Sequence, residues 1–337
     1  RRTPRELKAL GAVFIAELGL GPRDTMLSAY PLTTAAAIAQ FWAGLRAGCG
    51  IALHHPFDFA AFLDQLRDTG ATCTCVPAAV IDAMDRRGDF GGPAARLSRI
   101  GCVWPTPHAP ASPCEPPLPV FDIHSLGEMA VILRQREPAA GPALLPLGKL
   151  YARGAGEGTA PYLETRVRGS VRNGGAQKTL RGELLIRGTT VPGSAQSEPD
   201  HPGEGPPAHD AHGYIDSGVH CSVDETHPGL FACERDAEII YHGGAAIPVR
   251  ELDRIYADYP GFLDAAAFTI DDPVMGDRIF AAVIPRPELS LSLDTFRRYL
   301  SDKGIAPFKA PDRLVVVRDI PRRADGSIER ASILNRV

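Results

Sequence analysis

Cysteine and histidine are the first residues of this sequence to examine for chemistry, because both bind metals and thiolates also act as nucleophiles. The chain has seven cysteines, and none of them forms a CxxC pair. Cys73 and Cys75 alternate along an apolar run, which predicts that both side chains share one face of a strand. No histidine or acidic residue accompanies them at ligand spacing. We therefore predict small buried hydrophobic groups rather than metal ligands.

Three histidines form a second candidate cluster in a segment rich in proline, glycine and serine. His201, His209 and His212 lie between residues 189 and 213. A metal site is one interpretation, but their spacing is irregular and the composition is typical of a surface loop. Solvated histidines are the preferred interpretation.

The composition limits the classes of partner. The chain has 337 residues, of which 44% are hydrophobic and 23% charged, and its formal net charge is −4. This charge gives no electrostatic reason to bind nucleic acid or an anionic membrane surface, so a small molecule or a protein is the expected partner. An odd number of cysteines suits a reducing compartment, and no apolar run is long enough for a membrane span. The expected location is cytoplasmic.

The elements that would position these residues alternate along the first part of the chain. Thr3 and Glu6 form a capping box around Pro4, which predicts the start of a helix. Apolar periodicity then predicts helices over 7–18, 38–45, 59–66 and 78–84, and strands over 25–29, 51–53, 71–76, 100–104 and 120–123. This alternation is typical of a mostly parallel sheet with helices on its faces.

The remaining chain indicates a second, smaller domain. Residues 105–119 carry so many prolines that a loop is expected, and a β-rich region follows from 149 to 187. Residues 213–244 are expected to join the two domains. The predicted fold is a large layered α/β domain over 1–234 and a small mobile α+β domain over 235–337.

Several short stretches, taken in order, resemble the adenylate-forming superfamily of acyl-CoA synthetases, nonribosomal-peptide adenylation domains and luciferases. Near the C-terminus these are GG-x-x-I…E-x-D from Gly243 to Asp253, LDAAAFTIDDPVMGDRIFAAVI, APFKAPDRLVVV and IPRRADGSIER. GELLIRG at Gly182–Gly188 and FLDQLRDTGATCTCVPAAV resemble the large domain of the family. The resemblance extends over most of the chain.

The resemblance implies that ATP activates a carboxylic acid as an acyl-adenylate, which is then transferred to a thiol of coenzyme A or of a carrier-protein phosphopantetheine. This chemistry uses a phosphate-binding loop, Mg²⁺ on an acidic residue, a carboxylate on the ribose, and a lysine at the transition state. The family's phosphate loop would precede Arg1, so the sequence as given is expected to bind ATP poorly.

In HSLGE, the resemblance places the Mg²⁺ carboxylate at Glu128, which is also the first candidate catalytic acid. His124 then takes the aromatic position that faces adenine, and Ser125 and Gly127 replace a glycine and a threonine of the family pattern. The alternative is that Glu128 is only a negative charge at the N-terminus of a helix.

The ribose-binding Thr-Gly-Asp of the family corresponds to Ser217, Gly218 and Val219. Valine cannot accept hydrogen bonds from the ribose hydroxyls, so this step of nucleotide binding is expected to be weakened. Asp216 is a nearby carboxylate, but its offset along an extended segment predicts that it lies on the opposite face.

The hinge motif corresponds to Glu234, Arg235 and Glu238, with Arg235 also in the nucleotide site and Glu238 at the hinge position. An exposed ion pair is the alternative interpretation of Arg235 and Glu238. Gly243 and Gly244 would line the channel for the thiol.

The catalytic lysine of the family corresponds to Ser327. Serine carries no positive charge, and loss of one such group costs on the order of a hundred- to a thousandfold in rate. Arg322, Arg323 and Arg330 are the nearby cations that could replace it.

Three hypotheses follow. The first is a divergent AMP-forming ligase with impaired adenylation, and the second is a catalytically degenerate adenylation-fold protein that serves as a binding or scaffold module in acyl or polyketide-type biosynthesis. The third keeps only the transfer of a ready-made adenylate to a thiol. The sequence does not identify the acid.

Overall fold

The computed structural model contains two compact units, residues 1–235 and 236–337, and each is described by itself. No helix in the described part of the chain is both long and apolar enough to cross a membrane. The structure describes residues 2–30, 32, 34–55, 57–104, 115–126, 129–136, 144–174, 177–193, 209–234, 236–242, 245–272, 276–287, 292–323 and 326–334.

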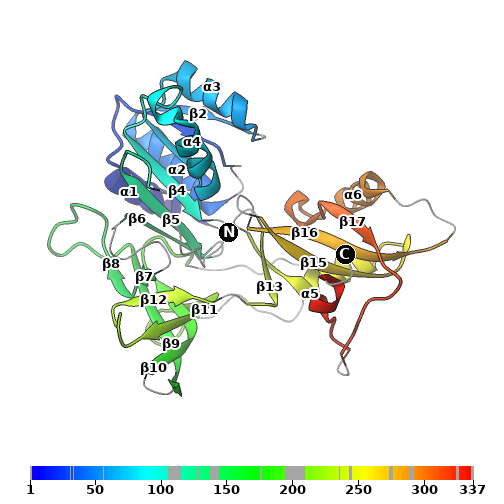
Figure 1. Cartoon of the computed structure of the whole chain (residues 1–337). Coiled ribbons are helices and arrows are strands. Elements are labelled where there is room, and N and C mark those ends of the chain that lie inside the picture. Colours follow the sequence, from blue (N-terminus) through cyan, green and yellow to red (C-terminus); the bar gives the residue numbers. More distant parts are fainter. Residues whose placement is uncertain are drawn as a thin grey trace. The chain divides into compact units, whose positions relative to one another are not determined.

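The first unit contains a six-stranded sheet that is parallel except at one edge (Figure 1). Short apolar runs form its central strands because both faces of these strands are covered. In spatial order the strands are β2 (Gly50–Leu53), β1 (Thr25–Ser28), β3 (Cys73–Pro77), β4 (Arg99–Trp104), β5 (Val120–Leu126) and the antiparallel β6 (Ala130–Gln135).

Four helices cover the two faces of this sheet. The predicted capping box is present at the first of them, where Thr3 accepts from the backbone of Glu6 and the Glu6 side chain accepts from the backbone of Thr3. α1 and α2 pack on one face, and α3 and α4 on the other. Their bounds are α1 (Pro4–Leu18), α2 (Ala35–Ala47), α3 (Phe59–Thr69) and α4 (Ala78–Arg87), and the short 3-10 turn η1 (Asp89–Gly91) follows them.

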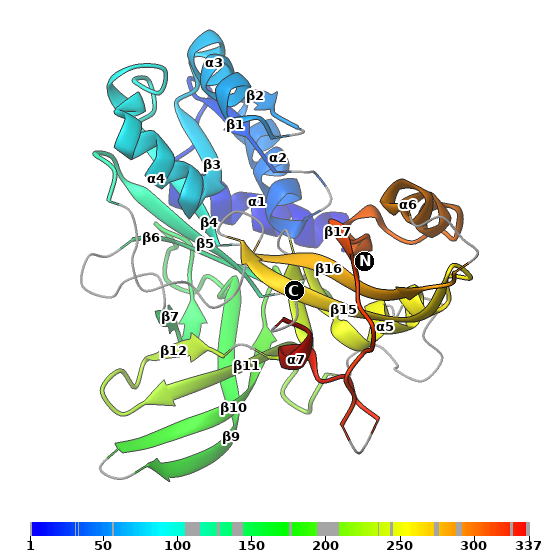
Figure 2. The same ribbon diagram turned by 45° about the vertical axis from the view of Figure 1, so that its right-hand side comes forward.

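A second six-stranded sheet, entirely antiparallel, completes the first unit (Figure 2). Its apolar face shares one core cluster with α1, α2 and the first sheet. In spatial order it contains β7 (Leu144–Pro146), β12 (Leu230–Cys233), β11 (Ile215–Asp224), β10 (Gln177–Arg187), β9 (Leu163–Gly174) and β8 (Gly148–Leu150).

This second sheet corrects the prediction that residues 213–244 act as a junction. Residues 215–233 of that stretch belong to the first unit, where they form the hydrogen-bonded strands β11 and β12 and the turn between them. The prediction extended too far because turn-forming glycines at both ends of the stretch hide the alternation of buried and exposed residues in β11.

The paired thiols behave as predicted. Cys73 and Cys75 are both fully buried and belong to the same core cluster. A hydrogen bond with the neighbouring Cys73 thiol, together with burial, raises the pKa of Cys75 well above its usual value. A thiol held in its neutral form is neither a good nucleophile nor a metal ligand.

The histidine-rich loop is described only in part, because His201 lies outside the described residues. The ring nitrogens of His209 are 3.2 Å from the carbonyl oxygen of Gly213 and 2.9 Å from that of Gly193. His212 is exposed. No group of three potential metal ligands occurs among the described residues.

The second unit is a five-stranded sheet with helices on both faces. α5 and α6 cover one face, and the short α7 packs on the other. Its elements are β13 (Ile239–His242), β14 (Ala245–Pro248), α5 (Val249–Ala257), β15 (Phe262–Asp272), β16 (Gly276–Pro285), α6 (Leu293–Asp302), the 3-10 turn η2 (Pro307–Lys309), β17 (Arg313–Val316) and α7 (Arg330–Leu334).

The predicted fold class is therefore confirmed: a large layered α/β unit is followed by a small α+β unit. One local prediction is wrong. Residues after position 128 form strand β6, so Glu128 does not precede a helix, and its alternative interpretation as a charge at a helix N-terminus is excluded. β-branched residues at 131 and 132 favour the strand, which pairs with β5.

Candidate functional site

Some predicted site residues can be placed in the structure and others cannot. Glu128, Arg235, Gly243 and Gly244 lie outside the described residues. His124 and Ser125 lie on β5, and Ser217 and Gly218 lie on β11, all in the first unit. Glu238 and Ser327 belong to the second unit.

His124 is fully buried near the carboxyl end of β5. Its ring stacks on Trp104 of β4, with centroids 5.9 Å apart and an interplanar angle of 14°. Neither ring nitrogen has a hydrogen-bond partner in the described part of the chain. Burial lowers the pKa of His124 to about 3, because a charged imidazole would lose its hydration. The negative charge of Asp122 opposes this shift, and the positive charges of Arg134 and Arg136 add to it.

A buried polar network lies beside this ring. The Trp104 indole N–H donates to Asp122 Oδ1 at 2.9 Å, and Arg136 Nε donates to Asp122 Oδ2 at 3.0 Å. The Arg136 guanidinium also lies over the Trp104 ring at 5.8 Å. The carboxylate of Asp122 is therefore already engaged and is not available to His124. The next residue along β5, Ser125, is half-buried and lies opposite Val131 of β6.

The resemblance to the ribose-binding motif falls on a bulge in β11. Gly218 has a φ of +72°, a backbone conformation that favours glycine, and the pairing of β11 with β10 shifts register here. Ser217 Oγ donates to the Leu184 carbonyl at 2.7 Å and accepts from the Val219 N–H at 3.2 Å. Both polar functions of Ser217 are thus committed to holding the bulge.

The bulge places Val219 in the apolar core. Its side chain is only 2% exposed and belongs to the core cluster between the two sheets. Asp216 lies on the other side of the strand, where its carboxylate accepts from the Gly218 N–H and lies 3.5 Å from Arg168. The side chains at 217 and 219 therefore do not fit a bound ribose.

Restoring the family's carboxylate at Val219 should cost stability. Val219→Asp would bury an acid among apolar side chains, and we expect it to lower the free energy of unfolding of the first unit by about 2 kcal/mol. Urea titration followed by tryptophan fluorescence measures this, because Trp42 and Trp104 both lie in the first unit. Val219→Ala gives the cost of lost volume alone. A Val219→Asp variant no less stable than Val219→Ala would show that this side chain is not in the core.

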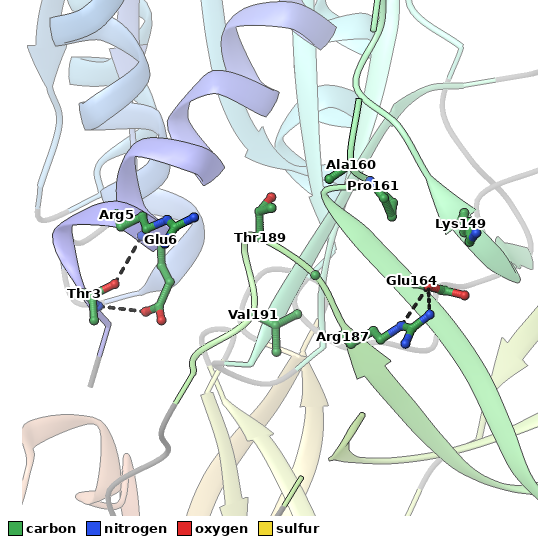
Figure 3. Close-up of a pocket in the computed structure, with 11 residues that line it drawn as sticks. Thr3, Arg5, Glu6, Lys149, Ala160, Pro161, Glu164, Arg187, Thr189 and Val191 are labelled. Carbon is green, nitrogen blue, oxygen red and sulfur yellow. Dashed lines mark hydrogen bonds and ion pairs between the residues drawn. The ribbon is translucent and has the colours of Figure 1, made fainter. Parts of the chain in front are cut away.

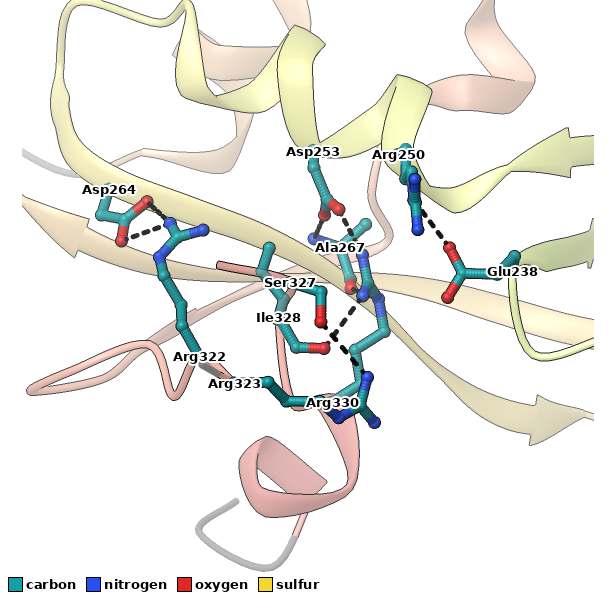
Figure 4. Close-up of polar contacts among 10 residues, drawn as sticks. All are labelled: Glu238, Arg250, Asp253, Asp264, Ala267, Arg322, Arg323, Ser327, Ile328 and Arg330. Carbon is teal, nitrogen blue, oxygen red and sulfur yellow. Dashed lines mark hydrogen bonds and ion pairs between the residues drawn. The ribbon is translucent and has the colours of Figure 1, made fainter. Parts of the chain in front are cut away.

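Ser327 lies in the second unit, between an exposed glycine and the buried Ile328 (Figure 4). Its carbonyl accepts from the Arg323 N–H at 2.8 Å, and the Arg323 guanidinium donates to its hydroxyl at 3.4 Å. The hydroxyl carries no charge, but an arginine side chain lies directly beside it. Of the three nearby arginines, Arg323 is thus the one that the structure places at Ser327.

The other two arginines are committed to carboxylates. Arg330 forms an ion pair with Asp253 and donates to the Ala267 carbonyl at 3.1 Å. Burial raises the pKa of Asp253, an effect that the charge of Arg330 opposes. Arg322 binds both carboxylate oxygens of Asp264 at 2.8 Å. These contacts connect the last segment to α5 and β15, so Arg322 and Arg330 have structural partners already.

Glu238 lies at the start of the second unit and is half exposed. Its carboxylate accepts from Arg250 Nε at 3.0 Å, and both side chains are largely in solvent. Exposed pairs of this kind contribute little stability. The described contacts of Glu238 therefore resemble an ordinary surface ion pair.

A pocket of about 500 Å³ with charged side chains in its lining lies in the first unit (Figure 3). It is formed by the first turn of α1, by β8, by the start of β9 and by the segment that follows β10. Arg5, Lys149 and Arg187 supply positive charges to its lining, and Glu6 and Glu164 supply negative ones. None of the predicted site residues that the structure describes lines it.

Sequence reasoning missed this pocket. Arg5 lies inside the predicted helix start between Pro4 and Glu6, and Lys149 is the first residue of the predicted β-rich region. Strand pairing places Lys149 opposite Glu164 and Glu164 opposite Arg187, and the first turn of α1 adds Arg5 to the same pocket. The single available signal was the alternation of charged residues on these strands, whose register the sequence does not reveal.

Comparison of the sequence with known proteins finds ligases that act on carboxylic acids, while no family model matches the chain. Medium-chain fatty-acid–CoA ligase of Escherichia coli is 32% identical over 160 residues, which is 46% of this chain and 28% of that protein. Pyochelin synthase PchD of Pseudomonas aeruginosa is 31% identical over 157 residues, with the same shares. Sulfoacetate–CoA ligase of Cupriavidus necator is 26% identical over 99% of this chain and 63% of its own length.

Solved structures show the same fold. Amide bond synthetase McbA of Marinactinospora thermotolerans matches with a TM-score of 0.69 at 16% identity, over 98% of this chain and 64% of that one. o-Succinylbenzoate CoA synthetase of Bacillus subtilis matches with a TM-score of 0.64 at 17% identity, over 99% and 66%. The chain thus spans less than two thirds of these relatives.

These matches define the class of protein. The chain has the fold of adenylate-forming enzymes, and its sequence is similar to acyl-CoA and aryl-acid ligases. The resemblance to the adenylate-forming superfamily is confirmed.

Proposed function

We propose that this chain is a divergent AMP-forming ligase that handles a carboxylic acid and a thiol acceptor and whose adenylation step is impaired. Similarity to acyl-CoA ligases supports the reaction class. Two substituted positions support the proposed loss of adenylation activity. Val219 is buried in the core, and Ser327 supplies a hydroxyl where the family has a lysine. A preorganised cation at the reacting phosphate is worth on the order of a hundredfold or more in rate.

The implied ligands are ATP or AMP, Mg²⁺, and coenzyme A or a phosphopantetheine. The acid is a small carboxylic acid, and a carrier protein is the alternative thiol acceptor. The names of the relatives suggest which acids to try first, since they include a medium-chain fatty-acid ligase, a salicylate adenylyltransferase and a sulfoacetate ligase.

Two half-reactions assayed separately test the proposal. Acid-dependent exchange of pyrophosphate into ATP reports adenylation, with octanoate, salicylate and sulfoacetate as the acids. Consumption of the matching synthetic acyl-adenylates in the presence of coenzyme A reports thiol transfer. We expect exchange to be at least about a hundredfold slower than in an intact ligase, while transfer is retained. Exchange at the ordinary rate of a ligase would contradict the proposed impairment.

A second candidate function is a binding or scaffold module in acyl or polyketide-type biosynthesis. It is favoured by the same two substitutions in a chain whose cores remain apolar and continuous. Such a protein would bind an acyl-adenylate or a carrier protein without consuming either. Binding in calorimetry together with no activity in both half-reactions would select this function over the ligase.

A further inference from the structure

The pocket of the first unit has a distinct arrangement of charged side chains. Lys149 of β8, Glu164 of β9 and Arg187 of β10 form one row across three hydrogen-bonded strands. Arg5 lies in the first turn of α1, on the opposite side of the pocket from Lys149 (Figure 3). A cation therefore stands on each side of one concave space.

Both carboxylates of the pocket already accept hydrogen bonds, but only Glu164 is paired with a cation. Glu164 accepts a hydrogen bond from Arg187 Nε at 2.8 Å. Burial raises the pKa of Glu164, but hydrogen bonds from Arg187 and Tyr214 and the nearby positive charges of Arg187 and Lys149 outweigh it. The pKa therefore lies below its usual value. Glu6 accepts from the backbone N–H of Thr3 at 2.7 Å and of Gly193 at 2.9 Å. The carboxylates of Glu6 and Glu164 are thus both engaged in hydrogen bonds within the protein.

Arg5 and Lys149, the cations on the two sides of the pocket, differ from Arg187, which is paired with Glu164. Arg5 and Lys149 are exposed, and neither forms an ion pair in the described part of the chain. Three cationic and two acidic side chains line the pocket, so it has a surplus of positive charge. Concave surfaces with a surplus of one sign concentrate ions of the opposite sign.

Gly188 and Thr189, which follow β10, also line the pocket. Gly188 has a φ of +148°, and a Cβ there would lie 2.3 Å from the Tyr162 carbonyl oxygen, so this residue cannot carry a side chain. The adjacent Thr189 is exposed and lines the pocket. Its hydroxyl is a further donor next to the two cations.

We infer that this pocket binds a phosphate- or pyrophosphate-bearing ligand through Arg5 and Lys149. A single carboxylate can neutralise one of the two cations, whereas a phosphate dianion or a diphosphate has enough charge and acceptor oxygens for both. Arginine supplies a planar fork to such an anion and lysine a compact charge. A volume of about 500 Å³ is within the range of small-molecule sites, so the pocket also has room for the organic part of the ligand.

Isothermal titration calorimetry on the whole chain tests this inference without any turnover, which keeps it separate from the proposed ligase activity. The probes are inorganic pyrophosphate, coenzyme A and pantetheine, which has no phosphate. Arg5→Gln and Lys149→Gln should each weaken pyrophosphate binding about tenfold, because each removes one charge-assisted contact. Lys8→Gln is the matched control, since Lys8 is an exposed cation of the same helix that does not line the pocket.

The probes also distinguish a free anion from a ligand phosphate. If coenzyme A binds tightly and loses affinity in the same two variants, the phosphates of a larger ligand occupy the pocket. If pyrophosphate alone depends on Arg5 and Lys149, the site takes the free anion. In both cases binding should weaken as salt rises from about 50 mM to about 200 mM. Binding that is equal in Arg5→Gln, Lys149→Gln and Lys8→Gln, with tryptophan fluorescence unchanged, would overturn the inference, as would binding of none of the phosphate probes.

Discussion

Replacing His124 with phenylalanine should remove a large part of the acid sensitivity of the first unit. The imidazole is fully buried, and its pKa is lowered from 6.5 to about 3. Below pH 6.5 the unfolded chain binds a proton at this residue while the folded chain does not, so the free energy of unfolding falls as the pH is lowered. The loss begins near the unfolded pKa and is complete near the folded one.

The expected size follows from proton linkage. Each pH unit within this window costs about 1.4 kcal/mol, so lowering the pH from about 7.5 to about 5 should cost the wild type about 2 kcal/mol more than His124→Phe. Phenylalanine keeps an aromatic ring next to Trp104 and removes two buried nitrogens that have no partner among the described residues. At neutral pH the variant should therefore be no less stable than the wild type.

Urea titrations at the two pH values, followed by tryptophan fluorescence, measure this difference. Both tryptophans belong to the first unit, so the signal does not depend on unfolding of the second. His212→Gln is the control, because His212 is exposed in the same unit and its replacement should leave the pH dependence unchanged. Equal acid sensitivity of wild type and His124→Phe would show that this histidine takes up its proton in the folded state.

Replacing Ser327 with lysine should raise the rate of acid-dependent pyrophosphate exchange by on the order of a hundredfold. The substitution restores a positive charge at the position that the family uses to stabilise the transition state. Ser327 is half-buried beside an exposed glycine, so the longer side chain has space to extend toward solvent. The Arg323 guanidinium lies next to the hydroxyl, and its repulsion should direct the new ammonium group away from it.

Two further variants identify the origin of any gain. Ser327→Ala removes the hydroxyl without adding charge and should leave exchange as slow as in the wild type. Arg323→Gln tests whether the neighbouring guanidinium already supplies part of the missing charge, in which case the residual rate should fall. If Ser327→Lys gains no activity while the acyl-adenylate is still consumed with coenzyme A, the missing lysine is not what limits adenylation.

The sequence alone was sufficient for the elements that depend on neighbouring residues. The capping box at Thr3 and Glu6, the alternation of Cys73 and Cys75, and the amphipathic helices all follow from contacts within a few positions. Collinear motifs also identified the family, because each motif is a local string. The substitutions at Val219 and Ser327 were likewise visible without any structure.

Other features could not be predicted, because they depend on strand register and on long-range pairing. A bulge at Gly218 decides that Val219 points into the core and Asp216 does not. Arg330 reaches Asp253 only after α5 and β15 have packed together.

The second sheet illustrates the same limit on a larger scale. Its strands come from segments as far apart in sequence as β7 and β12. The register of the consecutive strands β8, β9 and β10 brings Lys149, Glu164 and Arg187 into one row. A shift of one residue in any strand would turn these side chains to the other face. The sequence therefore determined the resemblance to the superfamily and the fold class, and it predicts that Val219 and Ser327 alter the catalytic site. Only the tertiary structure decided which side chains meet in the pocket, because backbone hydrogen bonds set the register of these strands and long-range packing brings the first turn of α1 to the same pocket.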